Sequence, residues 1–158
     1  MRSKRAKVRE ITPDFKYNSA KVAKLINRTM RDGKRSAAEK QVYDALEIIA
    51  QKTNKKPLDL LDEVLHMVTP QMEVRSRRVG GAAYQVPIPV HGRRGFSLAI
   101  RWLVQEANKR PSKQYHSFGE KLAAEMLDIL NNTGGSIARR DMAHRMAEAN
   151  KAFAHFRW

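Results

Sequence analysis

Residues 72–90 read MEVRSRRVGGAAYQVPIPV, the pattern of a β-hairpin that carries several arginines and has no core of its own. Gly80 and Gly81 accept the positive φ angles of a two-residue hairpin turn, and strand-forming residues flank them on both sides. The arginines of the first strand are Arg75, Arg77 and Arg78. A two-stranded ribbon alone is marginally stable in water, so we expect this cationic ribbon to project toward an anionic partner. The alternative is an ordinary surface hairpin with solvated arginines.

The charge of the whole chain indicates the nature of that partner. Lys and Arg number 31 against 16 Asp and Glu, which gives a formal net charge of +15. A chain this basic favours nucleic acid as its partner. Its 158 residues, of which 42% are hydrophobic, suffice for one domain with a core, and no linker or internal repeat divides them. We therefore expect a single domain over residues 1–158.

Several classes of function are excluded by what the sequence lacks. It contains no cysteine, so disulfides, thiolate nucleophiles and the common structural zinc sites are excluded. None of the five histidines pairs with another at the helical spacing of metal ligands, and the acidic residues offer no candidate general base. No apolar run is long enough to span a bilayer, and residues 1–10 lack the apolar stretch of a secretory signal. We expect a soluble intracellular protein without a metal, a cofactor, a membrane partner or enzymatic activity.

Two further groups of cations lie near the start of the chain. Residues 1–12 are expected to form a flexible basic arm of the kind that becomes ordered on nucleic acid, with a frayed terminus as the alternative. The cations of this arm are Arg2, Lys4, Arg5, Lys7 and Arg9. A helix then follows, capped by Asn18 or Ser19, with apolar residues at helical spacing as far as Met30. Its opposite side, which either attracts phosphate or is merely solvated, carries Lys21, Lys24, Arg28 and Arg31.

Helical spacing and capping signals predict five more helices. Capping boxes open the second helix at Ser36 and the fifth at Ser117, and the third helix follows Pro57. The fourth helix follows the hairpin and is apolar on more than one side, which favours a central position in a bundle. The sixth begins near Ser136 and is expected to continue to Phe156, with methionine and aromatic residues that pack in the core or against another protein.

These elements predict a mainly α, single-domain bundle of about six helices with a protruding two-stranded β-hairpin arm at residues 71–91. The string GKRS at residues 33–36 is similar to the end of a phosphate-binding loop, but Arg28 stands where that motif requires glycine, so nucleotide binding is rejected. Cations spread over an arm, a ribbon and several helix faces suit the irregular surface of folded RNA better than the groove of duplex DNA. Binding to such RNA should weaken steeply with salt.

Three separated strings carry a resemblance to a known family. They are VRSRRVGGAAYQVP at residues 74–87, LAIRWLV at residues 98–104 and HRMAEANKAFAHFRW at residues 144–158. Further similar strings are PDFKYNS at residues 13–19, DGKRSAAE at residues 32–39 and VYDAL at residues 42–46. In this order the strings resemble the bacterial-type ribosomal protein seven family of the small ribosomal subunit.

The resemblance implies a structural constituent of the small ribosomal subunit with six helices and an extended hairpin. Members of the family bind directly to the ribosomal RNA of the head, nucleate its assembly, and lie near exit-site tRNA and the mRNA path. Besides the arm and the first helix, the residues expected to bind RNA are Lys34, Arg35, Arg75, Arg77, Arg78, Arg93, Arg94, Arg101, Arg139, Arg140 and Arg145. Those expected near tRNA or the neighbouring ribosomal protein eleven are Gly80, Gly81, Tyr84, Lys151, Phe153, His155, Arg157 and Trp158.

Two rival functions stay open at this point. The family resemblance permits a translational repressor that binds an mRNA imitating the ribosomal site, and the charge alone permits a free DNA-binding protein. The resemblance further implies a cytoplasmic, ribosome-bound protein that is not a homo-oligomer, with an organelle ribosome as the alternative compartment.

Overall fold

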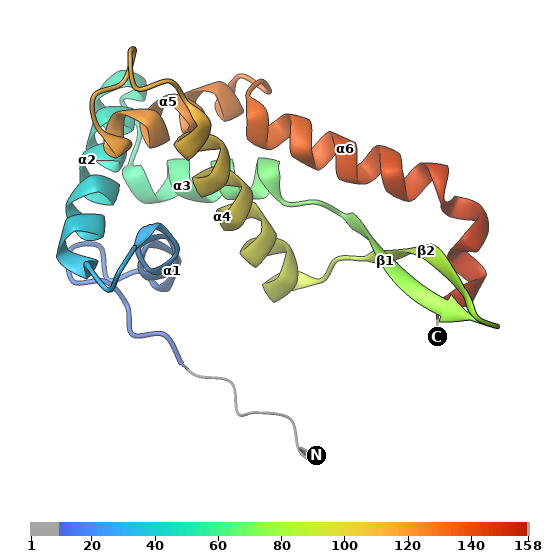
Figure 1. Ribbon diagram of the computed structural model, residues 1–158. Helices are drawn as coiled ribbons and strands as arrows, with labels where there is room; N and C mark the ends of the chain where they lie inside the picture. The colour runs from blue at the N-terminus through green and yellow to red at the C-terminus, as the bar shows by residue number, and fades with distance from the viewer. Residues whose placement is uncertain (1–9, 158) are drawn as a thin grey trace.

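A computed structural model describes residues 10–157 of the chain (Figure 1). The predicted contact residues that lie outside this range are Arg2, Lys4, Arg5, Lys7, Arg9 and Trp158. The elements, in order, are α1 (Ala20–Thr29), α2 (Arg35–Thr53), α3 (Pro57–Val68), β1 (Met72–Val79), β2 (Ala82–Pro89), α4 (Gly92–Lys109), α5 (Phe118–Leu130), α6 (Gly135–Ala149) and the 3-10 helix η1 (Lys151–Phe156). Figure 1 shows α1 to α5 gathered in a bundle, from which the hairpin projects with α6 running beside it. The predicted fold class is confirmed.

The core of the bundle is built around α4. This helix packs against α1, α3, α5 and α6, and Ala99 and Leu103 on it have no exposed surface. Burying one leucine side chain stabilises a fold by roughly 1.5–3 kcal/mol, so a helix with several neighbours contributes strongly. The prediction that the fourth helix is central, which was drawn from its apolar residues on more than one side, is confirmed.

The start of α1 is held by a carboxylate rather than by a capping hydroxyl or amide. Ser19 occupies the N-cap position, but neither its side chain nor that of Asn18 caps the helix. Asp14, which is 2% exposed, instead accepts hydrogen bonds from the amides of Tyr17 (2.8 Å) and Ser19 (2.9 Å) and from the Tyr43 hydroxyl (3.2 Å). Ser19 is thus the N-cap residue, one of the two predicted alternatives, but its side chain makes no capping hydrogen bond, and the Asp14 carboxylate holds the turn that precedes α1.

The two predicted capping boxes differ in outcome. At the start of α5, the amide of Glu120 donates to Ser117 Oγ at 3.2 Å, which confirms that cap. The cap predicted at Ser36 is wrong, since α2 begins one residue earlier, at Arg35, without a side-chain cap. Glu39, the expected partner in that box, instead accepts a 2.8 Å hydrogen bond from Arg35 Nε on the surface of α2.

The sixth helix is shorter than its apolar pattern predicts. α6 ends at Ala149, where Asn150 Nδ2 donates to the Met146 carbonyl oxygen at 2.8 Å, and the chain continues as the 3-10 helix η1. A side-chain amide that bonds a terminal carbonyl competes with helix continuation. The prediction of one helix as far as Phe156 is thus wrong. Met142 and Met146 are 54% and 49% exposed, so of the two roles predicted for them, the core is excluded.

The hairpin has the predicted turn but is better supported than the sequence indicates. Its strands pair antiparallel, and Gly80 and Gly81 at the tip have φ angles of +57° and +90°. Val86 of β2 has no exposed surface, because α6 and η1 pack along the ribbon. The ribbon thus has no core of its own, but α6 and η1 support it, while the arm still projects from the bundle (Figure 1).

The position of α6 is set by a buried ionic network at its first turn. Glu125 on α5 is 2% exposed and accepts hydrogen bonds from the amide and hydroxyl of Ser136 at 2.9 and 2.7 Å. Arg110 donates to the same carboxylate through Nε (3.0 Å) and Nη2 (2.7 Å), and it also pairs with Asp128. Burial alone would lower the pKa of Arg110, but the hydrogen bonds to Asp128 and Glu125 outweigh it and raise that pKa. The network joins α5, α6 and the end of α4.

Candidate nucleic-acid interface

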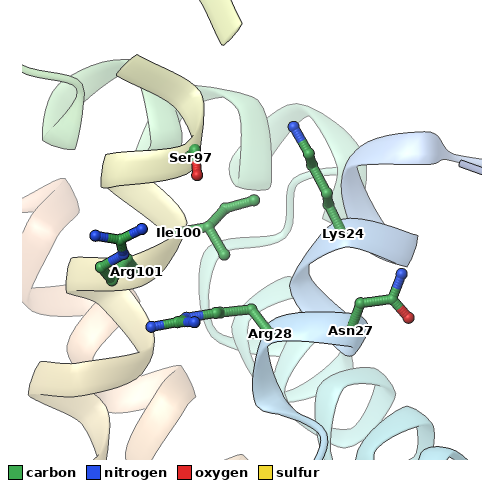
Figure 2. Close-up of a pocket in the computed structure, with 6 residues that line it drawn as sticks. All are labelled: Lys24, Asn27, Arg28, Ser97, Ile100 and Arg101. Carbon is green, nitrogen blue, oxygen red and sulfur yellow. The ribbon is translucent and has the colours of Figure 1, made fainter. Parts of the chain in front are cut away.

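A cationic groove lies between α1 and α4 (Figure 2). Figure 2 shows Lys24 and Arg28 extending from α1, with Arg101 opposite them on α4. The cavity measures about 210 Å³, and its lining residues are Lys24, Asn27, Arg28, Ser97, Ile100 and Arg101. None of the six is acidic. The groove therefore brings together three of the predicted RNA-binding cations, with an amide and a hydroxyl beside them.

Electrostatic repulsion is already present at one end of this groove. Burial lowers the pKa of Lys24 below its usual value, and the positive charge of Arg93 lowers it further. The Lys24 ammonium lies 4.7 Å from the centre of the Phe96 ring, a favourable contact that leaves its charge unneutralised. An anion bound here would favour the charged form of Lys24 and relieve the repulsion. The groove is thus suited to a phosphate group.

The hairpin arginines divide into one that is paired and two that are not. Arg75 donates from Nε to Glu73 at 2.6 Å, and Glu73 also accepts from Arg94 at 3.0 Å. Burial alone would raise the pKa of the Glu73 carboxyl, but the hydrogen bonds from Arg94 and Arg75 outweigh it, and the pKa lies below its usual value. Arg77 stands opposite Tyr84 on β2, and Arg78 stands opposite Ala83. Neither Arg77 nor Arg78 makes an ion pair or a side-chain hydrogen bond within residues 10–157.

The same division runs through all the predicted RNA-binding cations of the described chain. Those with neither an ion pair nor a side-chain hydrogen bond in it are Lys24, Arg28, Lys34, Arg77, Arg78, Arg93, Arg101 and Arg145. Those that bond other side chains or the backbone are Lys21 to Asp62, Arg31 to Asn108, Arg35 to Glu39, Arg75 and Arg94 to Glu73, Arg139 to Glu106 and Gln105, and Arg140 to Asp141 and the Met67 carbonyl. Of the second group, Lys21, Arg94 and Arg139 join different elements through their ion pairs as well as carrying charge.

Several of the residues predicted to lie near tRNA or a partner protein come together along the arm. Tyr84 of β2 packs against Phe153 and Phe156 of η1, with ring centroids 5.3 and 5.1 Å apart. The His155 ring lies beside that of Phe156, with the ring centroids 3.9 Å apart and the rings tilted by 45°. Lys151 and Arg157 both line a separate groove beside the base of the hairpin. We call the contact of Tyr84 with Phe153 and Phe156 the aromatic clasp, since it joins the arm to the C-terminal segment.

Sequence reasoning missed the role of Glu73. A signal was present, because residues two apart on a strand share a face, and Glu73 stands two before Arg75. The contact with Arg94, which lies 21 residues away, depends on how the hairpin returns to α4 and has no local signal. The long-range pairs of Lys21 with Asp62 and of Arg139 with Glu106 were missed for the same reason.

Residues 10–157 contain no group of three or more His, Asp or Glu side chains placed to hold a metal ion. Among the helices of the same range, none is both long and apolar enough to cross a lipid bilayer. The cationic groove and the hairpin instead gather several of the unpaired cations of the described residues. Together with the helical body, they define a nucleic-acid-binding protein.

Comparison with known proteins identifies the family. Residues 1–151 match the family model described as ribosomal protein S7p/S5e. Proteins named small ribosomal subunit protein uS7 are similar over nearly the whole chain: that of Dictyoglomus thermophilum is 60% identical over 95% of this chain and 94% of its own length. The corresponding protein of Caldanaerobacter subterraneus subsp. tengcongensis is 57% identical over the same shares, and that of Thermosipho melanesiensis is 52% identical over all of both chains.

The chain belongs to the ribosomal protein S7p/S5e family. The resemblance noted in the sequence is confirmed, and so is the expected function at the level of the family: a structural constituent of the small ribosomal subunit that binds ribosomal RNA. Family membership also confirms that the protein is not an enzyme, and it makes the protein ribosome-bound.

Proposed function

We propose that the chain binds directly to the RNA of the small-subunit head through the cationic groove and the unpaired hairpin arginines, and that it nucleates assembly of the head. The observation that carries this proposal is the set of unneutralised cations on α1, α4 and β1. Folded RNA brings phosphate strands close together, and two separate cationic surfaces can bind two such strands at once. The chain acts as one RNA-binding domain over residues 1–158, with a basic arm at 1–12 and a hairpin arm at 71–91.

The far end of the arm is proposed to face a different set of neighbours. The hairpin tip and the C-terminal segment carry exposed glycines and cations beside half-buried aromatic rings, which suit exit-site tRNA, the mRNA path and ribosomal protein eleven. One copy serves each subunit, without homo-oligomers. The proposed compartment is a bacterial cytoplasm, because the relatives are bacterial, with an organelle ribosome as the alternative.

Binding measurements with charge-neutral variants test the RNA surface. We expect Arg77→Gln combined with Arg78→Gln to weaken binding to the head RNA while helical circular dichroism persists, because each arginine lacks an intramolecular partner whose loss would disturb the fold. The matched control is Lys40→Gln combined with Lys52→Gln, which removes the same charge from lysines of α2 that are unpaired within the described chain and lie outside the proposed surface. Equal weakening in both double variants would mean that only net charge matters.

Comparison of nucleic acids distinguishes the rival functions. Wild-type protein is titrated at moderate salt with head RNA, an unrelated folded RNA and duplex DNA. We expect clear preference for head RNA, and equal affinity for all three would overturn the proposal. Nucleation is tested by reconstituting the subunit with and without the chain and following protection of the head RNA from chemical probes. Head protection that arises equally well without the chain would refute nucleation.

A further inference from the structure

A second cleft lies where the base of the hairpin meets α4 and α6. Its apolar wall is formed by Val74 of β1, Trp102 of α4 and Met146 of α6. The side-chain amides of Gln85 and Asn150 also line it, and its volume is about 460 Å³. Sites for small molecules commonly measure about 300–1,000 Å³ and combine an apolar lining with a few polar groups. The cleft matches both features.

The apolar wall is open in the isolated chain. Met146 is 49% exposed, and Trp102 is only partly buried although it packs against the core. Only three large hydrophobic residues of the described chain are strongly exposed, namely Phe15, Met142 and Met146. Apolar surface gathered in one concave place usually marks a contact with another molecule.

The polar groups of the cleft are available for hydrogen bonding. The Gln85 side chain makes no hydrogen bond within residues 10–157, so its donor and acceptor are both free. Asn150 donates through Nδ2 to the Met146 carbonyl oxygen, which leaves its Oδ1 free to accept. Planar amides of this kind pair with the edges of nucleobases.

Charge complementarity favours a nucleotide over an apolar protein side chain as the occupant. Glu73 also lines the cleft, and its negative charge is neutralised by ion pairs with Arg75 and Arg94. The unpaired Arg77 and Arg78 follow on the same strand. An RNA strand that contacts these arginines would carry its bases past the cleft.

We propose that this cleft receives a single unpaired nucleobase of the bound RNA. The base packs on Trp102 and Met146, its edge hydrogen-bonds to Gln85 and Asn150, and the unpaired Arg77 and Arg78 contact the phosphates of the same strand. This inference rests on the proposed RNA-binding function and adds recognition of a base to a surface that otherwise contacts only phosphate groups. A base held in this way would set the register of the RNA along the hairpin.

Tryptophan fluorescence tests the position of the base. The chain has two tryptophans, so Trp158→Phe leaves Trp102 as the sole reporter. We expect head RNA to quench the Trp102 emission, because a nucleobase stacks on or beside the indole. Heparin carries anionic groups without bases, so it should bind the same cations without quenching. Equal quenching by heparin and RNA, or no quenching by bound RNA, would overturn the inference.

Variants of the cleft, with a matched control on α6, test how much the cleft contributes to the affinity for RNA. Met146→Ala and Gln85→Ala, which alter the cleft, should each weaken binding to head RNA. For Met146→Ala we expect a loss of affinity of about fivefold, which corresponds to the lower end of the free energy that one stacked base contributes. The control is Met142→Ala, which removes a methionine of similar exposure one turn away and outside the cleft. Circular dichroism checks that all three variants are folded.

The outcomes separate this inference from the proposed function. If Arg77→Gln with Arg78→Gln weakens binding but Met146→Ala and Gln85→Ala do not, the cleft holds no base and the proposed function stands. If wild-type protein does not bind head RNA, both are overturned. If the cleft variants impair only the binding of a neighbouring ribosomal protein, the occupant is a protein side chain and the inference is wrong.

Discussion

Replacing Glu125 with glutamine should strongly destabilise the fold. Glu125 is 2% exposed and accepts from Arg110 at 2.7 and 3.0 Å and from Ser136 at 2.7 and 2.9 Å. In Glu125→Gln, one oxygen of similar position can still accept from Ser136, but an NH₂ group then faces the Arg110 guanidinium. Two donors oppose each other, and the charge-assisted bonds are lost.

The expected loss can be estimated from these contacts. Hydrogen bonds to charged groups contribute about 1.5–3 kcal/mol, and an unsatisfied buried donor costs a further 1–3 kcal/mol or so. Arg110 retains Asp128 as a partner, which limits the damage. We therefore expect the free energy of unfolding to fall by about 2–4 kcal/mol, equivalent to roughly 10 °C in the midpoint of thermal unfolding for a chain of this size.

Thermal and urea unfolding followed by circular dichroism measure this loss. The control is Glu63→Gln, which removes an exposed carboxylate 3.5 Å from Lys55 and should change stability by less than about 0.5 kcal/mol. If Glu125→Gln is no less stable than Glu63→Gln, the buried network does not hold α5 and α6 together, and the reasoning is refuted.

Three further predictions concern local features. Bound RNA should raise the lowered pKa of Lys24. The affinity for RNA should therefore fall as the pH rises through the pKa that Lys24 has in the free protein, and NMR titration measures this pKa and the affinity. Tyr84→Ala removes the aromatic clasp and should speed amide hydrogen exchange in residues 72–89 about tenfold, without change in the helices. Ser117→Ala should reduce the free energy of unfolding by about 1 kcal/mol, whereas Ser36→Ala should change it little in urea titrations.

Each of these has an outcome that would contradict it. A Lys24 pKa that does not move on RNA addition would mean that no phosphate occupies the cationic groove. Unchanged exchange in the hairpin of Tyr84→Ala would mean that α6 alone supports the arm. Equal effects of the two serine variants would contradict the difference in capping between α2 and α5.

Local signals in the sequence predicted most of the fold. The Gly80–Gly81 turn, the helical spacing of the core residues and the Ser117 cap each depend on neighbours a few residues away. The predictions failed where a more distant or competing group intervened. Asp14 accepts from the amides of the turn before α1, and Glu39 bonds to Arg35 on the surface of α2 instead of forming the expected capping box with Ser36.

The candidate interface was harder to predict in detail. Sequence identified the cations but could not tell paired from unpaired ones, because pairing depends on tertiary contacts such as that of Lys21 with Asp62. The groove between α1 and α4 joins residues more than seventy positions apart, so no spacing signal exists for it. The cleft beside Trp102 likewise requires the hairpin, α4 and α6 to be in place.

The ion pairs of the predicted RNA-binding residues also affect which polyanions the protein tolerates. A phosphate that approaches Arg75 or Arg94 must compete with Glu73 for the guanidinium, and the displaced Glu73 carboxylate then repels the bound phosphate. Flexible polyanions with no defined spacing gain little from such an exchange. A rigid ligand whose phosphates are placed opposite the unpaired guanidinium and ammonium groups avoids this competition. Acidic side chains among the cations therefore give the surface selectivity that its large positive charge alone would remove.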